Sequence, residues 1–251
     1  MTMGRILFAS DLDNTLLFSS LHRGDTDRCV EHLEGREQGF CTRRSLELLE
    51  LLNERVEFIP VTTRSAAQYR RILWPTPCAP RYAVTTNGGL LFHRGQEDPE
   101  WCGQSRALAA PWQEELLDLQ GRLGQAPMLK RARMVDGLYL FAACDDGESA
   151  QAGGRFFTGK TGLDIAVSGR KVYFFPPPIN KGTALQRLKE RFRPDRTICA
   201  GDSTIDLPML RAGDVAVLPR EGMLEEGDLR IHRGGGPFPD FVLETVLREV
   251  L

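Results

Sequence analysis

Two acidic clusters, each placed directly after a short apolar run, constrain the fold of this chain more than any other feature. The clusters are Asp11 with Asp13 after residues 5–10, and Asp202 with Asp206 after residues 197–200. Both runs are typical of buried strands. Paired carboxylates at the end of a buried strand raise each other's pKa unless a cation lies between them. Since ligands bind at the carboxyl ends of strands in open α/β sheets, the clusters predict a site there.

Either cluster alone has an ordinary alternative interpretation. An Asp-Asn pair such as Asp13-Asn14 is common in solvated turns after strands. Asp206 alone would be an acidic residue that complements a helix N-terminus. Together, three or four oxygen donors from two strand ends suit a hard cation such as Mg²⁺.

The two ends of the chain alternate between strand-like and helix-like segments, which predicts an α/β fold with a Rossmann-like parallel-sheet core. The polar stretch 19–38 interrupts this order and is interpreted as an excursion or a loop. The expected strands are 5–10, 56–61, 82–86, 197–200 and 215–218, and the expected helices begin near Thr42 and cover 65–74, 181–191, 207–211 and 238–250.

The middle of the chain has a different pattern, which predicts an inserted α+β domain. It reads as helix, hairpin, helix, hairpin, and Asp136-Gly137 and Ser168-Gly169 mark the two turns. The expected helices are 107–123 and 149–160, and the expected strands are 128–135, 138–144, 163–167 and 171–175. We therefore expect a core of residues 1–87 and 177–251 and an insert of residues 88–176.

Charge and composition exclude several classes of protein. The chain has 32 Lys and Arg against 34 Asp and Glu, which gives a formal charge of -2 and argues against a nucleic-acid partner. No apolar run approaches the ~20 residues of a membrane-spanning helix, and the N-terminus does not resemble a signal peptide. The six cysteines contain no C-x-x-C pair and are expected to be free thiols. We expect a cytoplasmic monomer or homodimer with no membrane partner.

Two further candidates gain meaning from their positions. Thr62 follows the second expected strand, and Lys181 begins a helix after the prolines 176–178. Each alone is nearly uninformative, because a single Lys is usually a solvated charge.

In this order the residues resemble the four motifs of the haloacid dehalogenase superfamily of phosphohydrolases. The motifs are Asp11-x-Asp13-x-Thr15, then Thr62, then Lys181, then Gly201-Asp202-x3-Asp206. The insert resembles the α+β cap of the sugar-phosphatase branch, which includes sucrose-phosphate phosphatase-like enzymes, and Asn87-Gly88-Gly89 resembles its Asn-Gly signature at the cap entrance. Thr62-Thr63-Arg64 departs from the usual Thr-Gly-Arg, Asn14 replaces the commoner Gly, and the segment after Thr15 is longer than usual.

The resemblance implies a role for each matching residue. Asp11 would be the nucleophile, and Asp13 would be the general acid and base. Thr62 and Lys181 would hold the phosphoryl oxygens. Mg²⁺ would be bound by Asp11, the Asp13 carbonyl and Asp202. The supporting residues would be Thr15, Ser203 and Asp206, and the residues in contact with substrate would be Arg64, Asn87 and Gly88.

The function predicted from the resemblance is a Mg²⁺-dependent phosphatase that hydrolyses a small phosphate monoester, such as a sugar phosphate, through an aspartyl-phosphate on Asp11. Two alternatives stay open at this stage. One is a phosphomutase of the same superfamily, which must keep water out of its site. The other is a non-catalytic module that retains the fold and the metal site.

Overall fold

Residues 5–251 are described by a computed structural model, in which the chain forms two compact units. One unit contains the chain up to Glu97 together with Lys181–Leu251, and the other contains Asp98–Asn180. None of the helices within the described residues has the length and apolar character needed to cross a membrane.

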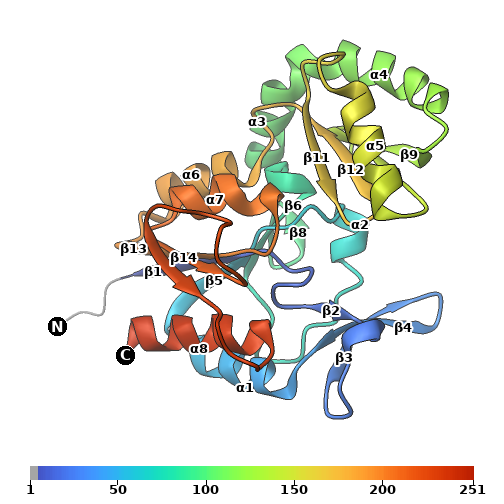
Figure 1. Cartoon of the computed structure of the whole chain (residues 1–251). Coiled ribbons are helices and arrows are strands. Elements are labelled where there is room, and N and C mark those ends of the chain that lie inside the picture. Colours follow the sequence, from blue (N-terminus) through green and yellow to red (C-terminus); the bar gives the residue numbers. More distant parts are fainter. Residues whose placement is uncertain (1–4) are drawn as a thin grey trace. The chain divides into compact units, whose positions relative to one another are not determined.

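The first unit is built on a five-stranded sheet in the order β15-β14-β13-β1-β5 (Figure 1). Every neighbouring pair runs parallel, and β1 lies between β13 and β5. Parallel strands are covered on both faces, which explains why β1 reads as a continuous apolar run. The strands are β1 (Ile6–Ser10), β5 (Val56–Pro60), β13 (Arg196–Ala200), β14 (Val215–Leu218) and β15 (Asp228–Ile231).

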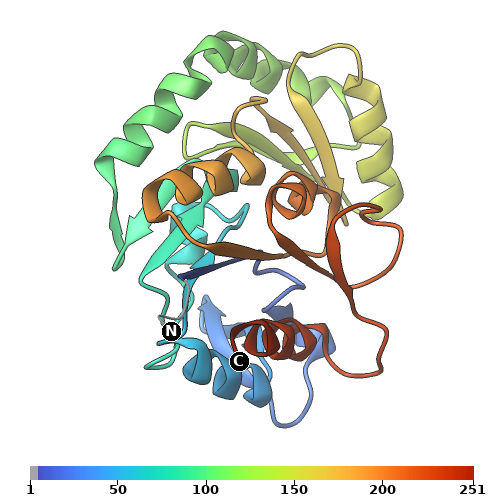
Figure 2. The same ribbon diagram turned by 90° about the vertical axis from the view of Figure 1, so that its left-hand side faces the viewer.

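Helices cover both faces of this sheet (Figures 1 and 2), so the α/β prediction is confirmed. In both views α1 and α8 lie together on one face, and α6 and α7 lie on the other. Thr42 caps α1 as predicted, because its hydroxyl accepts a hydrogen bond from the Ser45 amide at 2.8 Å. The helices are α1 (Arg43–Leu52), α2 (Ala66–Tyr69), α6 (Lys181–Phe192), α7 (Leu207–Ala212) and α8 (Phe238–Val250), with 3-10 turns η2 (Thr86–Gly88) and η5 (Thr204–Asp206).

The loop predicted for residues 19–38 is wrong, because this segment forms most of a three-stranded antiparallel sheet in the order β2-β4-β3. Its turn, Glu34-Gly35, has φ values of 52° and 75°, the left-handed pair that a two-residue hairpin needs. Val30 and Phe40 are buried on the inner face of this sheet. The elements are β2 (Phe18–Ser19), η1 (Ser20–His22), β3 (Arg28–Leu33) and β4 (Arg36–Cys41), and we call them the inserted sheet.

The first unit also contains a small antiparallel sheet of three strands. The predicted domain boundary at residue 87 falls in the turn between its first two strands, whereas the compact unit continues to Glu97. The strands are β6 (Tyr82–Thr85), β7 (Leu90–His93) and β8 (Gln96–Glu97).

The second unit has the helices and hairpins predicted for the insert but covers Asp98–Asn180 rather than 88–176. Its four-stranded antiparallel sheet has the order β11-β12-β10-β9. Leu116, Leu140, Phe157 and Phe174 lie in its core. The helix predicted over 107–123 is instead divided between α3 and α4 by a 3-10 turn. The elements are α3 (Pro99–Ala109), η3 (Ala110–Trp112), α4 (Gln113–Arg122), η4 (Leu123–Gln125), β9 (Lys130–Val135), β10 (Tyr139–Ala143), α5 (Gly147–Phe157), β11 (Asp164–Ser168) and β12 (Lys171–Phe175).

Candidate active site

Asp11 is fixed at the carboxyl end of the central strand β1. Its amide donates to the Ala200 carbonyl at 2.9 Å, which extends the pairing with β13 by one residue beyond β1. On the other side, the Val61 amide donates to the Ser10 carbonyl at 2.8 Å. The main chain on both sides of Asp11 is therefore held by neighbouring strands, and the Asp11 side chain is 8% exposed.

Lys181, the first residue of α6, joins two of the predicted site residues. Its Nζ donates to Asp11 Oδ1 and to Asp206 Oδ1, both at 2.5 Å. Burial lowers the pKa of Lys181, but Asp11 and Asp206 together outweigh this effect and leave the pKa above its ordinary value. Gly182 permits the close approach of α6 and α7, since a Cβ there would lie 2.7 Å from the Pro208 carbonyl oxygen.

Asp206 organises the loop after β13 through its second oxygen. Asp206 Oδ2 accepts from the Ser203 amide at 2.9 Å, the Ser203 hydroxyl at 2.7 Å and the Asp202 amide at 3.2 Å. A Cβ at Gly201 would lie 2.4 Å from the Asp206 Cβ, so this turn requires glycine. With one oxygen on Lys181 and the other on three donors, Asp206 supports the site and has little capacity left to bind an ion.

Asp202 completes the buried acidic group. Oxygens of Asp11, Asp202 and Asp206 lie within 4.8 Å of one another. Thr15, which is fully buried, places its hydroxyl 3.4 Å from Asp202 Oδ1. Burial, together with repulsion from Asp206, raises the pKa of Asp202 to about 6, although Lys181 opposes the shift.

The pKa of Asp11 is also raised well above its ordinary range. Burial is the main cause, Lys181 opposes it, and the neighbouring carboxylates Asp206 and Asp202 raise it further. Charged oxygens in such surroundings are stabilised by a bound cation, and all-oxygen donors suit Mg²⁺. The residues present therefore fit the predicted metal, and Asp11 and Asp202 could supply its carboxylate ligands.

Among residues 5–251 one other group has metal-ligand side chains close together. Cys29, His32 and Glu37 lie on the inserted sheet and are largely exposed. Glu37 is already paired with Arg23 at 2.7 Å. The exposed group is therefore a weaker metal candidate than the buried carboxylates at the strand ends.

Asp13 is held by Arg64 in a two-pronged ion pair. Arg64 Nε donates to Asp13 Oδ2 at 2.9 Å, and Arg64 Nη2 donates to Asp13 Oδ1 at 2.8 Å. This planar geometry fixes the direction of a carboxylate as well as its charge. The Asp13 side chain is 45% exposed, in contrast to the buried Asp11.

Thr62, Asn87 and Gly88 are brought together by main-chain hydrogen bonds. The Asn87 amide donates to the Thr62 carbonyl at 3.0 Å, and the Thr62 hydroxyl accepts from the Arg64 amide at 3.2 Å. Thr86 and Asn87 have φ values of 55° and 56°, in the left-handed region that Asn tolerates better than a β-branched residue. The structure thus places Thr62, which follows β5, beside the buried turn that carries Asn87 and Gly88 in the first unit.

Two residues of this network were not predicted from the sequence. Glu31, on β3, accepts from Arg64 Nη1 at 2.9 Å and from Arg71 Nε at 2.9 Å. Glu31 is fully buried, although it comes from a stretch whose charge indicated a solvated loop. A single sequence offered no signal for it, because the pairing depends on residues more than thirty positions apart.

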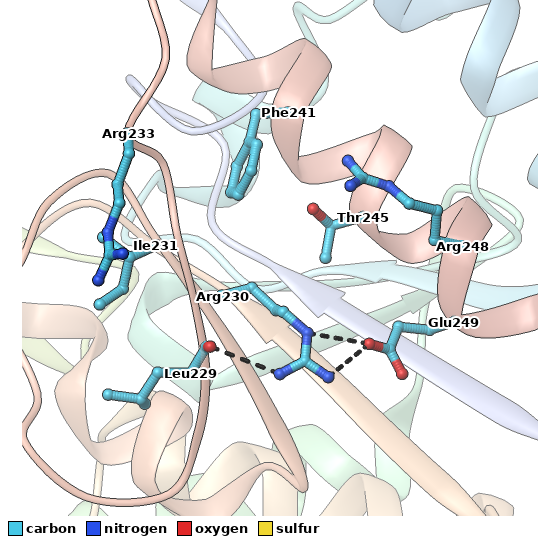
Figure 3. Close-up of a pocket in the computed structure, with 8 residues that line it drawn as sticks. All are labelled: Leu229, Arg230, Ile231, Arg233, Phe241, Thr245, Arg248 and Glu249. Carbon is cyan, nitrogen blue, oxygen red and sulfur yellow. Dashed lines mark hydrogen bonds and ion pairs between the residues drawn. The ribbon is translucent and has the colours of Figure 1, made fainter.

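A pocket of about 390 Å³ lies elsewhere in the first unit, between β15 and α8 (Figure 3). Its basic side chains are largely satisfied by the protein: Arg230 donates to Glu249 at 2.8 Å, and Arg248 Nε donates to the Glu244 carbonyl at 3.1 Å. It contains none of the predicted site residues, so the strand ends remain the candidate active site.

No protein-family model and no curated protein matches the sequence. Solved structures do match in fold. The sucrose-phosphatase of Synechocystis sp. PCC6803, in complex with sucrose and phosphate, has a TM-score of 0.68 at 21% identity and covers 98% of both chains. The C-terminal domain of a C. albicans trehalose-6-phosphate phosphatase has a TM-score of 0.65 at 15% identity and covers 99% of this chain and 93% of that one.

A haloacid dehalogenase-like hydrolase from B. subtilis has a TM-score of 0.61 at 16% identity and covers 98% of this chain and 99% of that one. These likenesses extend over both units. The predicted resemblance is therefore confirmed at the level of the fold, which is that of the haloacid dehalogenase-like hydrolases with an α+β insert.

Proposed function

We propose that this chain is a Mg²⁺-dependent phosphatase that forms an aspartyl-phosphate on Asp11. The observation that carries the proposal is the position of the Asp11 carboxylate, which lies at the end of the central parallel strand and against the Lys181 ammonium at 2.5 Å. The half-buried carboxylate of Asp202 lies beside it. A carboxylate nucleophile next to a fixed cation is suited to attack a phosphate ester.

In the first step, Asp11 attacks the phosphorus of the ester. Lys181 holds Oδ1, which leaves Oδ2 to form the new bond to phosphorus. The bond from phosphorus to the ester oxygen breaks, and Asp13 gives that oxygen its proton. General acid help of this kind contributes about 10²–10⁴-fold.

In the second step, water hydrolyses the aspartyl-phosphate. Asp13, now a carboxylate, takes a proton from the water as the water oxygen attacks phosphorus. The bond between phosphorus and Asp11 breaks, so inorganic phosphate leaves and the Asp11 carboxylate is restored. Asp13 then carries the proton that the next cycle needs, and the two steps balance.

Lys181 and Thr62 stabilise the charge on the phosphoryl oxygens. An ammonium group has three donors, and Lys181 uses one each on Asp11 and Asp206, which leaves one for a phosphoryl oxygen. Asp11, Asp202 and the Asp13 carbonyl would hold Mg²⁺, which when bound would further neutralise the charge of the phosphate. Asp206, Ser203 and Thr15 keep Lys181 and Asp202 in place.

A phosphorylated sugar is the substrate class that we propose. Two of the solved structures with this fold are described as phosphatases of sucrose phosphate and trehalose 6-phosphate. The unit of residues 98–180 would select the substrate as a cap, and Asn87 and Gly88 would contact it. The bonds of Arg64 to Asp13 and Glu31 favour a role in holding Asp13 over direct contact with the sugar.

Phosphate release from a panel of hexose phosphates, sucrose phosphate, trehalose 6-phosphate and p-nitrophenyl phosphate tests the proposal. We expect release in Mg²⁺ and its loss in excess chelator, with activity restored when Mg²⁺ is returned. Release that requires an added sugar bisphosphate would indicate a phosphomutase. Ligand binding without release of phosphate from any ester would indicate a non-catalytic module.

The apparent affinity for Mg²⁺ is expected to fall below pH 6. The pKa of Asp202 is raised to about 6, so a proton competes with the metal below that pH and hardly competes above it. The Mg²⁺ concentration for half-maximal activity should change little between pH 7 and 8 and should rise by up to about tenfold per pH unit below 6. Equal values at pH 5.5 and 7.5 would contradict this prediction.

A further inference from the structure

The inserted sheet carries one buried carboxylate, that of Glu31, which pairs with the arginine that holds Asp13. The Glu31 side chain is 1% exposed and accepts from two arginines, Arg64 at 2.9 Å and Arg71 at 2.8 Å. Arg64 and Arg71 are both positively charged, and Glu31 places a buried negative charge between them. A buried charge is stable only when it is paired in this way. Removal of the Glu31 charge would therefore leave the Arg64 guanidinium without one of its two carboxylate partners.

A β-bulge directs Glu31 inward. The pairing of β3 with β4 shifts register on both sides of Glu31, and an extra residue of this kind re-aims a side chain. The opposite residue is Gly39, where a Cβ would lie 2.9 Å from Glu31 Oε2. The Leu73 amide donates to the Val30 carbonyl at 2.7 Å, which ties this strand to the segment after α2.

Arg64 transmits the position of Glu31 to Asp13. All three guanidinium nitrogens of Arg64 are used: Nη1 on Glu31, and Nε and Nη2 on Asp13. With Nη1 fixed, the plane of the guanidinium is set, and with it the direction of the partly exposed Asp13 carboxylate. Without Glu31, the Arg64 group could rotate and carry Asp13 with it.

We propose that Glu31 is a positioning residue for Asp13, so that the inserted sheet forms part of the catalytic machinery. The inference rests on the proposed function, because it assigns Glu31 to the proton transfers of Asp13. In both steps Asp13 must point at one oxygen, that of the leaving group and then that of water. A small displacement of such a group has a large effect on rate.

Glu31→Gln tests the proposal, because it keeps the size of the side chain and removes its charge. Glu37→Gln is the matched control, since Glu37 is an exposed residue of the same sheet. We expect Glu31→Gln to lower kcat for the best sugar phosphate by about 10–100-fold with little change in KM, the range found when partners that orient a functional group are removed. The control should keep wild-type rates.

The identity of the leaving group separates a positioning role from a purely structural one. A sugar alkoxide needs protonation by Asp13, whereas p-nitrophenolate leaves readily without it. Glu31→Gln should therefore lower kcat/KM less for p-nitrophenyl phosphate than for the sugar phosphate. In an Asp13→Asn background, adding Glu31→Gln should have almost no further effect, because the group that it positions is already gone.

Gly39→Ala provides a second variant in case Glu31→Gln fails to fold. It leaves every charge in place but pushes on the Glu31 carboxylate, so it should reproduce the selective loss on the sugar phosphate. Equal losses on both esters, or a full further loss in the Asp13→Asn background, would overturn the positioning role while the phosphatase proposal stands. A wild-type protein that releases phosphate from no ester would overturn both.

Discussion

Replacing Asp11 with Asn is expected to reduce phosphate release by at least about a thousandfold, since it removes the proposed nucleophile. The amide has the size of the carboxylate, and its oxygen can still accept the hydrogen bond from Lys181. It cannot form an aspartyl-phosphate. The loss should therefore appear in kcat for every ester of the panel, whatever the leaving group.

Trapping the phosphoenzyme tests whether the loss of phosphate release in Asp11→Asn comes from loss of the nucleophile. Wild-type protein quenched in acid during turnover should carry one phosphoryl group on the peptide that contains Asp11, and the variant should carry none. Asp118→Asn is a suitable control, because Asp118 is exposed and accepts a hydrogen bond from Arg122 at 3.0 Å within the second unit. A phosphoryl group on another residue, or near-normal turnover by Asp11→Asn, would contradict the role of Asp11.

The sequence was sufficient to place Asp11 and Asp202 at one site because their signals are local, whereas Lys181 was assigned to this site only through the resemblance. An apolar run followed by acidic residues marks the end of a buried strand, and parallel strands end at the same edge of a sheet. Strand β1 pairs with β13 in register from Ile6 to Ser10, which brings the residues after both strands together. The helix that starts at Lys181 then covers the same edge.

The inserted sheet was missed because its exposed strands lack a clear alternation of apolar and polar residues. The β3–β4 hairpin turns at Glu34-Gly35, which lacks the Asn or Asp that usually marks such a turn. Glu31 is a charged residue in a polar stretch and would be expected in solvent. Its burial depends on ion pairs with Arg64 and Arg71. The pattern of residues 19–38 cannot predict contacts with residues so distant in the chain.

The first domain boundary was predicted at residue 87 because Asn87-Gly88-Gly89 resembles the Asn-Gly signature at the cap entrance, whereas the compact unit continues to Glu97. In the structure these residues begin a tight turn that returns the chain antiparallel, so that Thr85 pairs with Leu90. A turn signal in the sequence indicates that the chain reverses direction. It does not indicate which unit the next strand joins. Strands β7 and β8 remain with the first unit because their partners lie in it.

Replacing Lys181 with Met is expected to destabilise the metal-free protein by about 3–5 kcal/mol at neutral pH, the usual cost of breaking a buried ion pair. The Lys181 side chain is 1% exposed and lies between Asp11 and Asp206. Met fills a similar volume, so the main effect is electrostatic. Two buried carboxylates would face each other without the cation that compensates them.

The pH dependence identifies this cause. Burial already raises the pKa of Asp11, Lys181 opposes that shift, and its removal raises the pKa further. The folded variant therefore holds a proton that the unfolded chain releases, so its stability should increase as pH falls from 7.5 to 5.5. Wild-type protein, whose Lys181 stays charged throughout this range, should show a smaller change.

Urea unfolding in chelator at the two pH values measures the effect. Lys189→Met is the control on the same helix, because Lys189 is half-buried and contacts the Ala212 carbonyl at 2.6 Å. It should cost about 1 kcal/mol with little dependence on pH. Adding Asp206→Asn to Lys181→Met should recover part of the lost stability by removing one uncompensated charge. A deficit independent of pH, or a double variant less stable than Lys181→Met, would show that packing rather than charge makes Lys181 necessary.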